Sequence, residues 1–216
     1  CSIRRKAAEK VYSELGRYQQ LKKKNPRLIL GMGGCVAQQW GRAIFKKLPH
    51  LDMVFGTRNI HQLPALLSAV EKGDAPVAEI SVAETIPSMG IVAPPPAGTV
   101  TAYVTIMQGC DNFCSFCVVP YLRGREESRG IDEISDEICT LADRGVKEVV
   151  LLGQNVNSYG RKGGNGSNFP ALIRKVAKID GIERIRFTTS HPKDLSPALI
   201  DCFAEVEKLC SHIHLP

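Results

Sequence analysis

Short apolar segments alternate with amphipathic helical segments along the sequence, and this alternation restricts the fold more than any other feature. In residues 1–75, apolar residues at helical spacing from Ile3 to Tyr18 predict a first helix. The remaining elements expected in this part are a strand at 28–30, a turn at 31–34, a helix carrying Trp40, Ile44 and Leu48, a strand at 53–55, and a helix carrying Leu63, Leu66, Leu67 and Val70. Alternating strands and helices predict a parallel-sheet α/β domain.

The alternation resumes after a proline-rich stretch at 76–98, which we expect to be a linker. The elements expected in 99–216 are strands at 100–106, 146–152, around Ile185 and Phe187, and at 212–215, with helices around Ile134 to Leu141, around Leu172 to Val176, and from Ser196 onward. Four strand-helix steps without a closing partner predict part of a TIM-type barrel. Chemistry in such barrels lies on the loops that follow the strands.

Composition excludes several classes of protein. Hydrophobic residues make up 44% and charged residues 23%, so a disordered or fibrous chain is not expected, and no apolar run is long enough to span a bilayer. The net charge of +6 favours a polyanionic partner only weakly. Eight cysteines without a signal peptide favour reduced thiols and a cytoplasmic location. Both ends look cut from a longer chain, because the first residue is Cys1 and the last is Pro216.

Three cysteines with C-x3-C-x2-C spacing, Cys110, Cys114 and Cys117, directly follow the first expected barrel strand. Three thiolates can hold three irons of a [4Fe-4S] cube and leave the fourth iron open to a substrate or cofactor. A zinc site needs a fourth ligand, for which His191 or His212 would have to fold in. Inert thiols are the other alternative. Cys139, Cys202 and Cys210 have no partner spacing and are expected to be packed thiols.

The cysteine spacing and the aromatic Phe116 before its last cysteine resemble the radical S-adenosylmethionine (SAM) superfamily. Within it, the chain resembles the methylthiotransferases, and among these the branch that modifies tRNA. The motifs that carry this resemblance are CSIR at 1–4, GGCVAQ at 33–38, DMVFGT at 52–57, PYLRGREESR at 120–129, GQNVNSYG at 153–160 and TSHP at 189–192. They cover essentially the whole chain.

The resemblance implies a set of site residues. Cys110, Cys114 and Cys117 would hold the radical cluster, and Cys1 and Cys35 would hold a second [4Fe-4S] cluster together with a cysteine expected upstream of Cys1. Cys35 also precedes an expected helix, whose N-terminus favours a thiolate. The loop residues Gln154, Asn155, Ser190 and His191 are candidates for binding SAM. The alternative is that they belong to ordinary polar loops with no role in binding. Tyr121, Arg123 and Arg125 are candidates for contacting the substrate, and both arginines could equally be paired with Glu126 and Glu127.

The function implied by the resemblance is methylthiolation of carbon 2 of isopentenyladenosine beside the tRNA anticodon. The alternatives are the same chemistry on threonylcarbamoyladenosine or on a ribosomal-protein aspartate, and a noncatalytic metal-binding RNA module. The expected partners are the tRNA anticodon loop, read as a splayed single-stranded base, and a low-potential electron donor. No membrane association is expected, and the protein is expected to be monomeric. Little or no turnover is expected from these 216 residues alone.

Overall fold

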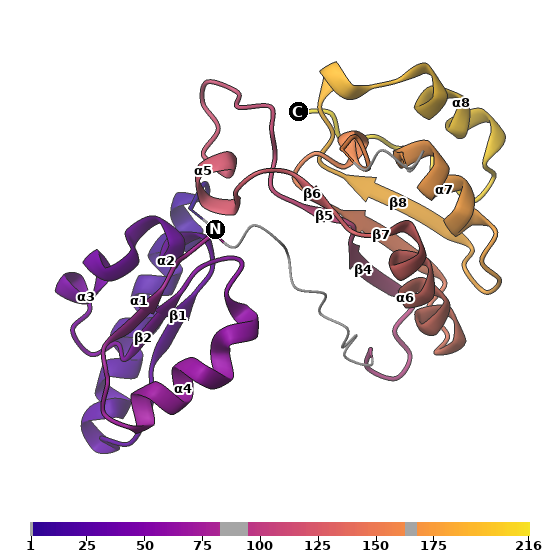
Figure 1. Cartoon of the computed structure of the whole chain (residues 1–216). Coiled ribbons are helices and arrows are strands. Elements are labelled where there is room, and N and C mark those ends of the chain that lie inside the picture. The colour runs from indigo at the N-terminus through magenta and orange to yellow at the C-terminus, as the bar shows by residue number, and fades with distance from the viewer. Residues whose placement is uncertain (1, 83–94, 163–167) are drawn as a thin grey trace. The chain divides into compact units, whose positions relative to one another are not determined.

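A computed structural model of the chain describes residues 2–82, 95–162 and 168–216. These residues belong to two compact units, coloured along the chain in Figure 1. The first unit comprises Cys1–Ser88 and Cys114–Gly124, and the second comprises Met89–Phe113 and Arg125–Pro216. In the described part of the chain, no helix is long and apolar enough to cross a membrane.

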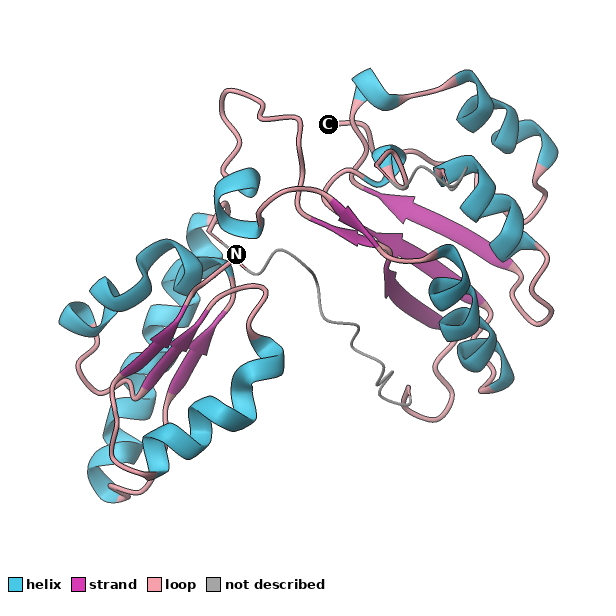
Figure 2. Cartoon of the chain, in the orientation of Figure 1, coloured by secondary structure: helices cyan, strands magenta, loops and turns pink. Residues whose placement is uncertain are grey.

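The first unit contains a parallel sheet in the order β1-β2-β3, with helices around it (Figure 2). Its strands are β1 (Gly31–Gly33), β2 (Met53–Phe55) and β3 (Val77–Glu79), and its helices are α1 (Arg5–Lys24), α2 (Cys35–Trp40), α3 (Ile44–Lys47), α4 (Leu63–Glu71) and α5 (Val119–Arg123), with 3-10 turns at Gly41–Ala43 and Ile60–Gln62. The core of this unit joins Leu15 of α1, Val36 of α2 and Val54 of β2. The predicted α/β domain is therefore present.

Two predictions for the first unit need correction. The first strand is Gly31–Gly33, whereas we expected a strand at 28–30 and a turn at 31–34. The glycines of this strand give no apolar alternation in the sequence, so the strand was not predicted at this position. Side chains of β2 fill the space beside them: a Cβ at Gly31 would lie 2.6 Å from Met53 Cε, and one at Gly33 would clash with the ring of Phe55. The second correction concerns the linker expected at 76–98, because Val77–Glu79 pairs with β2 as a third strand. Residues 83–94 of that stretch lie outside the described residues.

The second unit is built on a parallel sheet in the order β4-β7-β8. The elements of this unit are β4 (Thr101–Thr105), β5 (Met107–Gln108), β6 (Glu127–Ser128), α6 (Ile131–Asp143), β7 (Glu148–Leu152), a 3-10 turn at Val156–Ser158, α7 (Phe169–Ala177), β8 (Arg184–Thr188), a 3-10 turn at Pro192–Asp194, and α8 (Pro197–Glu205). Residues alternate along each strand between a buried face and a more exposed one. Strands followed by helices, with the helices on one face, fit the predicted partial barrel (Figure 2).

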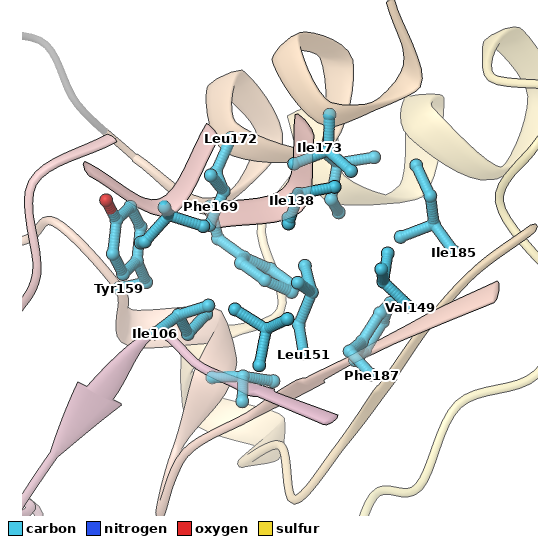
Figure 3. Packing of buried hydrophobic residues seen from close by; sticks show 14 of the residues in the cluster. Ile106, Ile138, Val149, Leu151, Tyr159, Phe169, Leu172, Ile173, Ile185 and Phe187 are labelled. Atoms are coloured by element: carbon cyan, nitrogen blue, oxygen red, sulfur yellow. The ribbon is translucent and has the colours of Figure 1, made fainter. Parts of the chain in front are cut away.

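The core of the second unit lies between this sheet and helices α6, α7 and α8. Phe187 of β8 meets Phe169 of α7 edge to face, with ring centroids 5.0 Å apart, and Leu151 of β7 packs beside them (Figure 3). Tyr159 lies at the margin of the cluster, where its hydroxyl donates to the backbone oxygen of Arg129 at 2.7 Å (Figure 3). The core fixes the strands whose carboxyl ends carry the polar loops.

Three features of the second unit differ from the prediction. No strand forms at 212–215; instead, Leu209 makes an isolated parallel bridge to Ile185 of β8. The two-residue strands β5 and β6 pair antiparallel, an arrangement too short to leave a periodic sequence signal. Cys139 is exposed, so the expectation of a packed thiol is wrong there, whereas Cys202 is fully buried against α7 and burial raises the pKa of its thiol. Cys210 is half-buried and follows α8.

Candidate functional site

The loops after the strands of the second unit meet at the carboxylate of Asp194. Asn155, on the loop after β7, donates its side-chain amide to Asp194 Oδ2 at 2.7 Å. Asn112, on the cysteine loop, donates to the same oxygen at 3.2 Å. Arg161 Nη1 lies 2.7 Å from Asp194 Oδ1 as an ion pair, although it is not oriented for a hydrogen bond. Three separate loops are therefore held together by one buried acidic side chain.

The electrostatics of Asp194 favour the charged form. Burial alone would raise the pKa of this carboxyl, since water is removed from the anion. The hydrogen bonds from Asn155 and Asn112, with the positive charge of Arg161, outweigh burial and lower the pKa below its ordinary value. Asp194 is thus an ionised anchor at neutral pH.

Three buried polar atoms of the second unit have no hydrogen-bond partner in the described part of the chain. They are Gln108 Oε1, Asn155 Oδ1 and Ser190 Oγ. Gln108 ends β5, and Asn155 and Ser190 follow β7 and β8. A buried polar atom without a partner is unfavourable by about 1–3 kcal/mol, so each of the three is a candidate for binding a polar ligand. Two of the three, Asn155 and Ser190, were predicted from the sequence.

The other two predicted cofactor residues have structural partners. Gln154 Oε1 accepts from the backbone N–H of Gly109 at 2.7 Å, which holds the start of the cysteine loop. His191 accepts at Nδ1 from the backbone N–H of Lys193 at 3.1 Å and so caps the 3-10 turn at Pro192–Asp194. The backbone of His191 also exchanges two hydrogen bonds with the side chain of Asn157, at 2.8 and 2.9 Å. The side chains of Gln154 and His191 therefore fix the loops that carry Asn155 and Ser190, the residues whose polar atoms have no partner.

The three cysteines of the C-x3-C-x2-C motif lie on the loop between β5 and α5. Cys110 is buried and belongs to the second unit, whereas Cys114 and Cys117 are half-buried and belong to the first. A turn joins the last two, because Cys117 donates its backbone N–H to the backbone oxygen of Cys114 at 2.9 Å. No disulfide is formed by the seven cysteines described, and no group of three or more metal-ligand side chains is gathered among residues 2–82, 95–162 and 168–216.

Left-handed backbone marks two positions beside the predicted site. Phe113, directly before Cys114, has φ of 45°, and Thr189, directly before Ser190, has φ of 68°. Residues other than glycine rarely adopt this region, and such strain concentrates at functional loops. Both loops are therefore held in conformations that their sequences would not choose alone.

The donor set fits an iron-sulfur cluster in its chemistry. Three thiols without a disulfide, on one loop within eight consecutive residues, match the ligands that hold three irons of a [4Fe-4S] cube. His191, one of the two candidates for a fourth ligand of a zinc site, uses its Nδ1 for a turn cap, and His212 is exposed. In the second unit, Asn155 Oδ1 and Ser190 Oγ have no partner among the described residues and can accept hydrogen bonds from a polar ligand.

The first unit carries the other predicted cluster residues. Cys35 is the first residue of α2 and is half-buried, which agrees with its expected place between a strand and a helix N-terminus. Cys1 lies outside the described residues. The predicted ligand set of a second cluster therefore has one described member in this structure.

The residues predicted to contact substrate lie in different settings. Tyr121 is 71% exposed on α5, and the backbone oxygen of Arg123 at the end of that helix accepts from Arg58 Nε at 2.9 Å. Arg125 lies 3.5 Å from Asp111 and covers the ring of Phe113. The nearby Arg129 pairs with Glu133 and Glu137 of α6.

Sequence reasoning missed two acidic residues of the second unit. Besides Asp194, the buried Glu126 lies 2.5 Å from Ser158 Oγ, and that hydroxyl lies 2.8 Å from the backbone oxygen of Asn155. Burial raises the pKa of Glu126, with the charges of Asp111 and Asp194 adding to the effect of burial and the Ser158 contact opposing it. An aspartate two residues after a Pro, or a glutamate inside an Arg-rich stretch, gives no periodic signal. Only the convergence of loops in space shows their importance.

Comparisons with family models match both parts of the chain. Residues 104–216 match the radical SAM superfamily. Residues 1–56 match the uncharacterized protein family UPF0004. The UPF0004 match lies within the first unit, and the radical SAM match covers most of the second unit together with Cys114–Gly124 of the first.

Curated relatives match over the whole chain. The tRNA-2-methylthio-N(6)-dimethylallyladenosine synthase of Syntrophus aciditrophicus (strain SB) is 57% identical over 216 residues, which are 100% of this chain and 47% of that protein. The protein of the same name from Geobacter sulfurreducens (strain ATCC 51573 / DSM 12127 / PCA) is 54% identical over 217 residues, which are 100% of this chain and 48% of that protein. The chain thus spans about half the length of the curated relatives it matches.

A comparison with solved structures shows a resemblance in fold. The similar structure is that of the radical S-adenosylmethionine methyltransferase TsrM from Kitasatospora setae, with tryptophan substrate and a SAM analogue bound. The TM-score is 0.62 with 16% sequence identity, over 93% of this chain and 44% of that one. At this identity the likeness concerns the fold alone.

Proposed function

Because the chain belongs to the radical SAM superfamily, we propose that it forms part of a methylthiotransferase that modifies carbon 2 of isopentenyladenosine in tRNA. The observation that carries the proposal is the C-x3-C-x2-C loop of Cys110, Cys114 and Cys117, in a chain whose second unit also carries buried polar atoms without partners at Asn155 and Ser190. The names of relatives that are 54 and 57% identical support the tRNA substrate. A cytoplasmic location agrees with tRNA as the substrate.

Each group of side chains has a distinct part in this proposal. Cys110, Cys114 and Cys117 would hold a [4Fe-4S] cluster whose open iron takes SAM. Such a cluster, once reduced by an external low-potential donor, would supply one-electron chemistry toward SAM, which side-chain acid-base groups cannot provide. Asn155 and Ser190 would bind polar groups of SAM, since their oxygen atoms are buried without partners.

The chain's own hydrogen bonds would preorganise these loops. Asp194 ties Asn155 and Asn112 together, and Gln154 fixes Gly109, the residue before Cys110. A cofactor therefore meets loops that are already ordered, which lowers the entropy lost on binding. Cys35, with Cys1 and a cysteine outside this sequence, would hold the second cluster as the source of sulfur.

The test of the proposal is product analysis with the full-length protein. The protein is reconstituted anaerobically with iron and sulfide, supplied with SAM, a low-potential reductant and tRNA lacking the methylthio group, and the tRNA nucleosides are separated by mass spectrometry. We expect 2-methylthio-isopentenyladenosine to appear. Methylthiolation of threonylcarbamoyladenosine alone would assign the other tRNA substrate, and modification of a ribosomal-protein aspartate would contradict the tRNA assignment.

A further inference from the structure

Helix α5, which begins two residues after Cys117, ends against two side chains from the loop after β2. Thr57 Oγ1 donates to the backbone oxygen of Leu122 at 2.9 Å, and Arg58 Nε donates to the backbone oxygen of Arg123 at 2.9 Å. Arg58 is only 5% exposed. These contacts lie within the first unit, which contains both the β2 loop and residues 114–124.

The contacts satisfy the end of the helix. The last carbonyl groups of a helix have no partner within it and carry partial negative charge, so a hydroxyl and a guanidinium are suitable donors there. Gly124 completes the approach: its φ is +78°, and a Cβ at this position would lie 2.8 Å from Val82 Cγ1 and 3.4 Å from Arg58 Nη2. At Gly124, directly after α5, the backbone thus lies close to Val82 and Arg58, and this close packing fixes the last turn of the helix.

The same edge of the first sheet carries Cys35. Gly34, the residue before Cys35, donates its backbone N–H to the backbone oxygen of Phe55 at the end of β2, at 3.1 Å. Helix α2, which starts at Cys35, also packs against α5. The loop after β1 and the loop after β2 therefore meet the cysteine-loop helix within one compact unit.

We propose that Thr57 and Arg58 are positioning residues that fix α5, and through it Cys114 and Cys117, to the edge of the first sheet that bears Cys35. The inference deepens the proposed function and depends on it for the role of these cysteines as cluster ligands. Neither side chain needs to touch iron or SAM. Their effect passes through the two carbonyl groups at the end of α5.

The test uses the full-length protein in metal-free and reconstituted forms, with variants Thr57→Val, Arg58→Ala and Arg58→Lys. In the metal-free form of Arg58→Ala, we expect hydrogen exchange at the amides of Leu122 and Gly124, and iodoacetamide labelling of Cys114 and Cys117, to become about fivefold to tenfold faster, as for the loss of one hydrogen bond. Labelling of the exposed Cys139 on α6 is the internal reference. Arg17→Ala removes another arginine, which pairs with Glu14 on the surface of α1, and should change neither readout.

The reconstituted form reports on positioning. We expect Arg58→Ala to reduce the change that SAM causes in the electron paramagnetic resonance spectrum of the reduced radical cluster, and Arg58→Lys to restore part of it, because lysine keeps the charge and a donor. Unchanged exchange and labelling in both Arg58→Ala and Thr57→Val would overturn the inference. The inference would also be overturned if hydrogen exchange in Thr57→Val became faster evenly over β1 and β2, because the substitution would then loosen the whole sheet and not α5 in particular. Failure of the wild-type protein to bind iron would instead count against the proposed function.

Discussion

Asn155 donates its side-chain amide to Asp194 at 2.7 Å, and this bond is one of those that join the loop after β7 to the loop after β8. Asp194 is 8% exposed and also accepts from Asn112 of the cysteine loop. Removing its charge should therefore loosen three loops at once. We expect Asp194→Asn to lower the free energy of unfolding by about 1–3 kcal/mol at neutral pH, measured by urea unfolding.

The effect of Asp194→Asn should depend on pH in a defined direction. The pKa of Asp194 is lowered in the folded state, so the stability that its charge contributes is present above the pKa of the unfolded chain. That contribution is lost as the pH falls through the folded-state pKa. The difference between wild type and variant should shrink across this acidic range, and a difference that grows on acidification would contradict the role of the charge.

Glu126 should show the opposite dependence. Burial raises its pKa, so the folded protein binds this proton more tightly than the unfolded chain does. The carboxyl therefore destabilises the fold progressively as the pH rises from the unfolded-state pKa through the folded-state one. We expect Glu126→Gln to raise the melting temperature at neutral pH and to have little effect at a pH below both pKa values. A variant that is less stable at neutral pH would show that the ionised form is favoured by the fold.

Tyr159 gives a prediction in the alkaline range. Burial raises its pKa to about 12, and its hydroxyl donates to the backbone oxygen of Arg129 at 2.7 Å. The fold should lose stability as the pH rises from the unfolded-state pKa of tyrosine toward this value, because only the unfolded chain ionises there. We expect Tyr159→Phe to remove this loss and to lower stability at neutral pH by about 0.5–1.5 kcal/mol. Alkaline titrations of the wild type and of Tyr159→Phe, followed by the absorbance of tyrosinate, test this prediction.

The Ser190→Ala variant should distinguish an effect on ligand binding from an effect on folding. The hydroxyl of Ser190 is buried without a partner, so Ser190→Ala removes no hydrogen bond of the described structure. Thermal stability of the ligand-free protein should stay the same or rise. The dissociation constant for SAM, measured by equilibrium dialysis on reconstituted full-length protein, should increase about threefold to tenfold. Ser211→Ala, an exposed site on the same unit, is the matched control. Equal affinity in the wild type and Ser190→Ala would remove Ser190 from the site.

The sequence predicted the elements with strong periodicity and missed those held by contacts distant in sequence. Helices α6, α7 and α8 and strands β4, β7 and β8 follow apolar spacing. The predicted position of β1 was wrong because its glycines, which leave room for Met53 and Phe55, give no apolar pattern. Strands β5 and β6 are too short to show a pattern. Helix α5, within a loop predicted only for its cysteines, is fixed by Thr57 and Arg58, which lie more than sixty residues earlier.

The candidate site was predictable where chemistry is encoded in spacing. The three cysteines stand out by their spacing, and Asn155 and Ser190 by their places after strands, where the structure leaves their oxygen atoms without partners. The acidic anchor Asp194 and the cap formed by His191 depend on which loops meet. Spacing along the chain carries no information about that convergence.

The central claim, that Cys110, Cys114 and Cys117 hold the cluster that cleaves SAM, is tested most directly by 5′-deoxyadenosine formation. Each cysteine is replaced by alanine in the full-length protein, which is reconstituted anaerobically and given SAM and a reductant, with Cys139→Ala as the control for an exposed thiol. We expect wild type and Cys139→Ala to form 5′-deoxyadenosine, and each of the three other variants to form none while keeping the far-ultraviolet circular dichroism of the fold. Formation of 5′-deoxyadenosine at the wild-type rate by any of the three would contradict the claim.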